Sequence, residues 1–443
     1  MPIPHLRLPR SIWIGAIGLF ALRALVILIW GEALSPDLAD HPVYHKNALK
    51  LLSGWEMWVT PGSEFGYRAP LFFAYIAGAL GLTGSESYHV SQIATALLST
   101  IDCVLVFVIA RALGGERAGQ IAFWIRGLLP SFLFSDTYVL SEHLFAIFML
   151  GALAIVAIAQ ARPTVRQSVV LGVLLGLCML TREAGLVFMA VFIAYLVLAA
   201  GSPRERALRP VACLVALSVM LLPWLIRNEA VWDKPLPLSY TAGVGLYNGN
   251  NPDFTGEGFM PAKPQGVDLK FGTPEYERWH REKALEYIMD DPAGFFARMP
   301  IKVAWFLWPR FQRYDLGVVY PSLGAAIQPL SLLIGLSSAL VLVIGVVCFL
   351  ARPIDAWWWV SLGIIGGIGA AILVTGGDPR YRDPIDYVFV IAIGTILAGD
   401  GNPLKRTLQT LLAQPWRALL VGVIYAVIGA SWLWVALFKS AQP

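Results

Sequence analysis

Charged residues are scarce in this chain of 443 residues: Asp, Glu, Lys and Arg together make up 14% of it, whereas hydrophobic residues make up 57%. Soluble globular domains contain about 25% charged residues, so the composition excludes an ordinary water-soluble protein. A helix that crosses a bilayer needs about 20 mostly apolar residues, and stretches of that kind recur along the whole chain. The sequence therefore predicts an all-α polytopic membrane protein.

Cysteine is also rare, and the motifs of nucleotide chemistry are missing. The four cysteines all fall inside apolar stretches, which argues against a disulfide framework or a zinc-ligand pattern. The sequence contains no Walker motif, dinucleotide-binding fingerprint or Gly-x-Ser-x-Gly turn. The formal net charge of +4 comes mostly from short basic loops, so it bears on topology and gives no reason to expect a nucleic-acid partner.

The basic loops predict the topology, because short loops rich in Lys and Arg lie in the cytoplasm. All of these loops can share one side only if an even number of spans separates each neighbouring pair. That condition gives about eleven transmembrane helices and requires the short apolar stretch from Pro70 to Leu82 not to cross. The first span is too long for a cleavable signal. The predicted spans are 11–31, 88–111, 118–136, 142–161, 167–181, 185–201, 209–226, 324–351, 356–376, 385–399 and 416–438.

We expect a single transmembrane domain over residues 1–443, with external loops at 32–88 and 227–322 and C-terminal transmembrane helices at 323–443. The first loop is expected to carry juxtamembrane helices that lie in the interface. The long loop contains a polar helix from Glu275 to Asp290, followed by an aromatic and basic element typical of a membrane interface. The residues that could carry chemistry gather on this external side.

Two carboxylates in external turns could act as bases. Asp40 begins a predicted helix whose apolar positions recur every three or four residues, and Tyr44 follows one turn later. A plainer interpretation is that Asp40 only caps this helix. Glu142 follows Ser141 at the start of a transmembrane helix, where an acid also complements the helix dipole. Asp136 in the same turn fits a solvated loop, so position alone leaves each alternative open.

Several arginines stand where helices meet the external surface. Arg68 precedes the interfacial stretch, where a guanidinium can bind phosphate through two hydrogen bonds, although a head-group anchor explains it as well. Arg182 and Glu183 form a charged hairpin, which is equally open to a structural ion pair. Further candidates are Arg227 at the end of a span, Arg380, Tyr381 and Arg382 in the loop before Pro384, and Tyr247 and Asn250 in a turn-rich loop.

Histidines near carboxylates raise the question of a metal. His41 and His45 lie one turn apart, and His143 directly follows Glu142. No third or fourth ligand can be assigned from the spacing. A divalent metal therefore stays possible, with no metal ligand named.

Two charges lie deep within predicted spans. Asp102 and Arg126 stand at similar distances on either side of the turn near Gly114, so an antiparallel hairpin would bring them to the same depth. A lone charge there would be costly, whereas a pair is partly self-compensating. We therefore expect these two residues to form an ion pair.

Taken in order, five segments of the chain resemble glycosyltransferases of family 39 with the GT-C fold, the group of protein O-mannosyltransferases and bacterial aminoarabinose transferases that use polyprenyl-phosphate sugars. The order of the segments matters more than any single motif. They are Asp40 to Trp55, Tyr67 to Leu71, Leu140 to Glu142, Pro223 to Asn228 together with Tyr247 to Asn250, and Gly377 to Pro384.

The resemblance implies a role for each matching residue. It assigns an essential acid of the first external loop to Asp40, with Asp37 as the weaker candidate, and the acidic position of the second loop to Glu142. His41 stands where the family often has a second acid. The donor phosphate would be held by Arg68, with Arg227 and Arg380 or Arg382 as looser matches. Residues expected to contact substrate are Tyr44, Asp136, His143, Arg182, Tyr247, Asn250 and Tyr381.

The resemblance also implies a reaction. A sugar would move from a polyprenyl-phosphate donor to an acceptor hydroxyl on the external, periplasmic side of a bacterial inner membrane, with inversion at the anomeric carbon. Arginines would stabilise the leaving phosphate, and a carboxylate would accept the proton of the hydroxyl. The acceptor could be a glycan, a lipid or a protein. The alternative is a transporter or flippase of a lipid-linked sugar, although the chain shows no convincing internal repeat.

Overall fold

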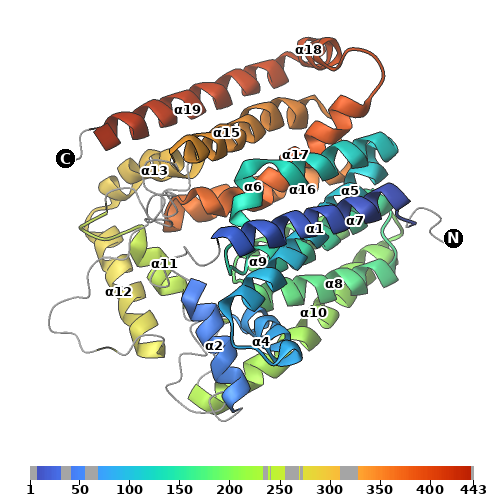
Figure 1. Cartoon of the computed structure of the whole chain (residues 1–443). Coiled ribbons are helices and arrows are strands. Elements are labelled where there is room, and N and C mark those ends of the chain that lie inside the picture. Colours follow the sequence, from blue (N-terminus) through green and yellow to red (C-terminus); the bar gives the residue numbers. More distant parts are fainter. Residues whose placement is uncertain are drawn as a thin grey trace.

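The computed structural model describes residues 7–30, 41–54, 68–232, 238–239, 241–254, 269, 273–309 and 328–440. Every regular element in these ranges is a helix (Figure 1), which confirms the all-α class. Four positions used above, Asp37, Asp40, Trp55 and Tyr67, lie outside the described residues.

The described helices follow one another along the chain in two halves. The first half contains α1 (Arg10–Trp30), α2 (His41–Ser53), α4 (Leu71–Thr83), α5 (Tyr88–Leu128), α6 (Pro130–Ser135), α7 (Glu142–Ala159), α8 (Val165–Thr181), α9 (Gly185–Leu198) and α10 (Pro203–Trp232). The second half contains α11 (Ala242–Asn248), α12 (Pro274–Asp290), α13 (Pro292–Leu307), α15 (Gln328–Ala351), α16 (Ala356–Thr375), the 3₁₀ turn η5 (Pro379–Arg382), α17 (Asp383–Ala398), α18 (Pro403–Ala413) and α19 (Pro415–Ser440).

Side-chain caps explain where several helices begin. The Thr164 hydroxyl accepts a hydrogen bond from the backbone N–H of Gln167, whose side chain in turn accepts from the backbone of Thr164, so a capping box starts α8. The Asp355 carboxylate accepts from the backbone N–H of Trp358 and starts α16 in the same manner. These polar residues satisfy backbone donors that the apolar helices would otherwise leave unpaired.

Seven of the described helices are long and apolar enough to cross a membrane, and an eighth candidate arises if α17 and α18 count as one span broken by a bend of 109°. The chain is therefore an integral membrane protein. Two predicted spans, 167–181 and 185–201, correspond to the shorter apolar helices α8 and α9. Two others, 88–111 and 118–136, correspond mainly to the two halves of α5, and the count of eleven stays a prediction.

The kink in α5 turns the chain back on itself. Gly115 has φ 84° and ψ 177°, a conformation that glycine adopts without steric cost. Beyond it Gly119 packs so closely on Phe107 that an added Cβ would lie 2.7 Å from the ring. This hairpin brings Nη2 of Arg126 within 3.5 Å of Oδ2 of Asp102, and the predicted ion pair is confirmed.

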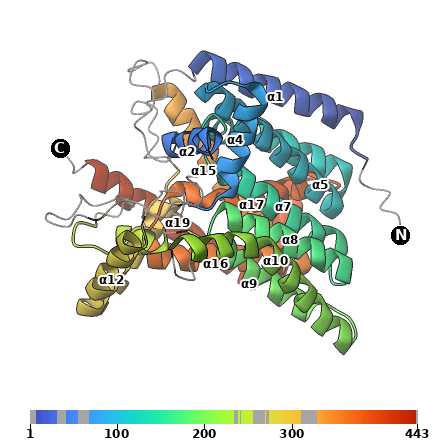
Figure 2. The ribbon, with the colours of Figure 1, turned by 90° about the horizontal axis from the view of Figure 1, so that it is seen from below.

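The long helices lie side by side in one bundle, and the short helices α2, α11 and α12 gather at one of its ends (Figures 1 and 2). The start of α1 and the end of α19 lie at opposite ends of the bundle (Figure 1). At the centre is α17, in which every residue from Ile385 to Gly394 is buried. All four cysteines are buried and unpaired as well.

Helices predicted outside the bundle are present in the described residues. The stretch from Pro70 to Leu82 forms α4, a helix of 13 residues, which is short for a span. The polar helix of the long loop is α12, and the aromatic and basic element after it is α13. The short helices thus surround the end of the bundle where the candidate residues cluster.

Candidate active site

A cavity of about 470 Å³ opens at this end of the bundle, with a wall that draws on α2, α7, α9, α11, α16, η5, α17 and the hairpin between α8 and α9. Segments that are hundreds of residues apart in the sequence therefore meet at one site. Six of the predicted site residues line the cavity, namely Tyr44, Arg68, Glu142, Arg182, Arg380 and Tyr381.

An interhelical ion pair lies in the cavity wall. Nη1 of Arg182 is 2.8 Å from Oε1 of Glu142, and the two side chains are 23% and 11% exposed. The same nitrogen donates to the Ser141 hydroxyl at 3.1 Å, and that hydroxyl is 3.1 Å from the hydroxyl of Tyr44. The structure thus pairs Arg182 with Glu142 and not with its neighbour Glu183. The chain Tyr44, Ser141, Arg182 and Glu142 fixes the geometry of this wall.

Two further arginines face the same cavity. The guanidinium of Arg68 lies 5.5 Å from the ring centre of Tyr44, at a distance typical of a cation–π contact. Across the cavity, Nε of Arg380 is 3.6 Å from Oδ2 of Asp378, and its guanidinium lies 5.3 Å from the ring centre of Tyr381. Together with Arg182 they give the cavity three guanidinium groups, a suitable set for an anionic ligand.

Glu183 also lines the cavity, although it is not among the site residues predicted from the sequence. Its carboxylate accepts hydrogen bonds from the backbone N–H of Ser239 at 2.9 Å and from the hydroxyl of Thr241 at 3.1 Å. Burial raises the pKa of Glu183, and these hydrogen bonds oppose the rise. Glu183 thereby ties the hairpin to the segment that leads into α11. Its place between two apolar helices was the signal that could have singled it out.

The other predicted site residues in the described part of the chain do not line this cavity. Arg227 donates to the side chain of Asn228 and lies over Trp224. Arg382 is 2% exposed and pairs with Asp386 at 3.0 Å. Tyr247 packs on Trp279, and the remaining three, Asn250, Asp136 and His143, are buried in polar networks.

One of these networks contains Lys302, which the sequence placed in a membrane-interface element. Its ammonium is fully buried and donates to Oδ1 of Asn250 at 3.0 Å and to the carbonyls of Leu373 and Val374 at 3.1 and 3.2 Å. Burial lowers the pKa of Lys302 to about 8. The lysine therefore joins α13 to the C-terminal end of α16, where free carbonyls attract a cation.

Among the described residues no group of three or more His, Cys, Asp and Glu side chains could hold a metal ion. Asp37 and Asp40 lie outside that part of the chain. In the described part, His45 contacts the hydroxyl of Ser91 at 2.9 Å. A divalent metal therefore has no described ligand set, and the site's described charges are those of arginines and carboxylates.

The overall fold resembles that of solved membrane enzymes. ArnT from Cupriavidus metallidurans, solved with undecaprenyl phosphate bound, matches with a TM-score of 0.51 and 16% identity over 90% of this chain and 62% of that chain. An oligosaccharyltransferase from Archaeoglobus fulgidus matches with a TM-score of 0.49 and 13% identity over 94% of this chain and 56% of that chain. The chain has the GT-C fold and spans less than two thirds of the length of either structure.

Residues 67–226 match the sequence model of a family described as dolichyl-phosphate-mannose-protein mannosyltransferase. The resemblance indicated by the motifs is thus confirmed over this stretch, which includes Arg68, Glu142 and Arg182. A search of curated proteins by sequence found no significant match. A transporter is not favoured by these comparisons.

Proposed function

We propose that the chain is a membrane glycosyltransferase that moves a sugar from a polyprenyl-phosphate donor to an acceptor hydroxyl. One observation carries the proposal: the cavity of a GT-C fold brings Arg68, Arg182 and Arg380 together with Glu142. A reaction that releases a phosphate needs cations aimed at the phosphate oxygens. Arginine meets that need with a planar group that can bind two oxygens at once.

Each charged residue of the wall has a distinct role in this proposal. Arg68 and Arg380 bind the donor phosphate and stabilise the charge that builds up on it as the sugar departs. Arg182 is already held by Glu142, so the pair adds little net charge, and Glu142 serves the reaction by orienting Arg182. Tyr44 and Tyr381 offer ring faces beside the arginines.

The proposed base is Asp40, which would accept the proton of the attacking hydroxyl. It lies outside the described residues. α2 begins at His41, the residue directly after Asp40. Tyr44, four positions after Asp40, lines the cavity. Both facts support a base at this edge of the cavity.

We propose that the cavity opens on the external side of the membrane, and the two ends of α10 support this orientation. Arg204 and Arg206 belong to one of the basic clusters expected in the cytoplasm, and they lie at the start of α10, whereas Arg227 lies near its end toward the cavity side. The positive-inside rule then puts the cavity on the external face of a bacterial inner membrane. The proposed acceptor is a glycan, lipid or protein that reaches this face.

Incubation of the purified protein with a set of undecaprenyl-phosphate sugars tests the proposal. Release of undecaprenyl phosphate, measured by mass spectrometry, is expected only with the matching sugar and acceptor. Movement of the intact donor across a vesicle membrane without release of the phosphate would instead indicate a flippase.

Arg68 gives a first mutational prediction. Arg68→Ala should weaken binding of undecaprenyl phosphate about tenfold or more, because a hydrogen bond to a charged group contributes about 1.5–3 kcal/mol. Arg68→Lys should recover only part of the affinity, since the ammonium keeps the charge but loses the planar fork. Titration of the lipid into nanodisc-embedded protein measures both. Arg278→Ala, an exposed arginine of α12, is the matched control; unchanged affinity in Arg68→Ala would return this residue to the role of a head-group anchor.

A further inference from the structure

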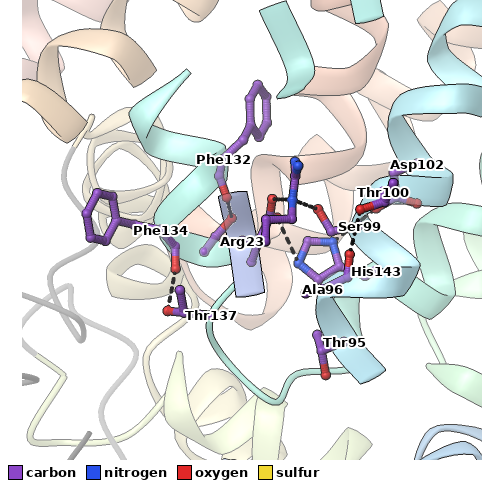
Figure 3. A network of polar contacts seen from close by, with 12 residues as sticks. Arg23, Thr95, Ala96, Ser99, Thr100, Asp102, Phe132, Phe134, Thr137 and His143 are labelled. Atoms are coloured by element: carbon purple, nitrogen blue, oxygen red, sulfur yellow. Dashed lines mark hydrogen bonds and ion pairs between the residues drawn. The ribbon is translucent and has the colours of Figure 1, made fainter. Parts of the chain in front are cut away.

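A cluster of charged side chains lies directly behind the cavity wall and takes no part in the mechanism above. Its members come from α1, α5, α7 and the segment between α6 and α7, and each is at least 95% buried. The buried charge cluster consists of Arg23, Asp102, Arg126, Asp136 and His143. Figure 3 shows Arg23, Ser99 and His143 close together, with Asp102 on the neighbouring stretch of α5.

The arginines and aspartates of the cluster balance in charge. Nε of Arg23 lies 2.7 Å from Oδ2 of Asp136. Nη2 of Arg126 lies 3.1 Å from Oδ1 of Asp136 and 3.5 Å from Oδ2 of Asp102. Two guanidinium cations thus face two carboxylates, so the net charge is zero when His143 is neutral and both carboxyl groups are ionised.

Both ring nitrogens of His143 face a carboxylate oxygen. Nδ1 is 3.0 Å from Oδ2 of Asp102, and Nε2 is 3.2 Å from Oδ1 of Asp136. A neutral imidazole has one N–H donor and one acceptor nitrogen, so one of these contacts would set a lone pair against a carboxylate. The contacts are satisfied when the cluster holds one additional proton, on the ring or on a carboxyl group, and its net charge is then +1.

Two residues next to the buried charge cluster connect it to the cavity. Glu142, the residue before His143, lines the wall, and so does Tyr387 of α17. The Tyr387 hydroxyl donates to Oδ2 of Asp102 at 2.9 Å and accepts from Nη2 of Arg126 at 3.3 Å. Buried ion pairs are often no more stabilising than apolar packing, and ionisable groups within a membrane bundle commonly serve function.

We propose that the buried charge cluster holds an additional proton and that its positive charge strengthens the binding of the anionic phosphate in the adjacent cavity. The inference rests on the proposed function, because it concerns the same donor phosphate. At an effective dielectric constant of about 20, one unit charge on the order of 10 Å from an anion changes its affinity by roughly tenfold.

Two acids close to His143 are already paired with arginines. Next to it along the chain Glu142 is neutralised by Arg182, and on α17 Asp386 is neutralised by Arg382. Cys103 of α5 accepts from Arg23, while Asp383 and Tyr387 of α17 line the cavity. Two more helices pack on α7: α16 contains no charged residue, and Arg166 of α8 lies about three turns from Cys178, the residue that contacts Phe145 of α7.

Two isosteric changes separate charge from mere contact. His143→Gln removes the ring whose two contacts require the additional proton, so the cluster should be neutral at every pH. Asp102→Asn removes one negative charge, so the cluster is positive at every pH with a neutral His143, whose Nδ1 can accept from the new amide. The two variants therefore shift the charge in opposite directions.

The experiment measures the affinity of undecaprenyl phosphate for wild type and both variants in nanodiscs between about pH 5 and 8, where histidine titrates. The lipid phosphate itself titrates in this range, and it does so equally with all three proteins. The ratio of each variant's affinity to the wild-type affinity at the same pH therefore cancels this contribution. His143→Gln should bind about tenfold more weakly than wild type at the acid end. Asp102→Asn should hold the wild-type acid-end affinity, and in both variants the additional pH dependence should be lost.

Equal weakening in both variants, or wild-type pH dependence in both, would overturn the inference. Ser99→Ala, which removes a neutral neighbour of both arginines, is the control and should keep the wild-type profile. If His143→Gln fails to fold, Asp102→Asn decides alone. A role based on contact alone predicts weaker lipid binding in this variant, whereas a role based on charge predicts unchanged binding at the acid end. Absence of binding in wild type would overturn the donor assignment itself and this inference with it.

Discussion

Asp40→Asn is expected to lower sugar-transfer turnover about a hundred- to ten-thousandfold, the usual contribution of a general base. Asparagine caps a helix about as well as aspartate, so α2 should form as before. Binding of undecaprenyl phosphate should change little, because the arginines of the cavity hold the phosphate. Turnover at saturating donor, together with the lipid titration, separates the two quantities.

The control for this experiment is Asp37→Asn, which changes the other acid of the same loop. It should keep nearly full turnover. If Asp40→Asn were almost as active as wild type while Asp37→Asn lost activity, the base would be Asp37. If both stayed active, Glu142→Gln would be the next variant to measure.

Arg382→Met is expected to destabilise the folded protein by about 3–5 kcal/mol, because it leaves a buried carboxylate without its cation. Arg382 donates to Asp386 at 3.0 Å, to the Ser338 hydroxyl at 2.6 Å and to the carbonyl of Leu307 at 3.3 Å. These contacts join η5 and α17 to α15 and to the end of α13. Thermal unfolding in detergent measures the loss.

Arg380→Met is the matched comparison, since the two arginines are two residues apart. Arg380 lines the cavity, so its loss should weaken binding of undecaprenyl phosphate and affect the unfolding temperature much less. The opposite pattern, with a stable Arg382→Met that no longer binds the lipid, would show that Arg382 contacts the donor.

The sequence predicted the helical class and the short helices of the loops, because apolar length follows directly from the bilayer. The family resemblance pointed to most of the segments that line the cavity, although Pro223 to Asn228 does not line it. The sequence also predicted the ion pair of Asp102 and Arg126, since a hairpin of two spans equalises their depth. It could not separate Arg380 from Arg382. Successive residues of a tight helical turn point in different directions, and only the packed structure shows which direction is the cavity.

Neighbouring positions on α7 give a second example. Glu142 faces the cavity while His143 faces the buried charge cluster, because adjacent residues of an α-helix lie about 100° apart around its axis. The sequence assigned a catalytic role to Glu142 and a substrate contact to His143, without showing that they face different surroundings. Arg23 was missed altogether, although a lone arginine inside the first apolar helix is costly enough to require a partner. That partner, Asp136, lies 113 positions further along the chain.

Because all four cysteines are buried, the native chain should not react with thiol reagents in its folded state. A membrane-impermeant maleimide would find no native thiol on the surface of the folded protein. Single cysteines introduced at exposed positions such as Arg206, Lys283 and Lys405 can therefore be read one at a time, from either side of a sealed vesicle, with the wild-type sulfurs still in place.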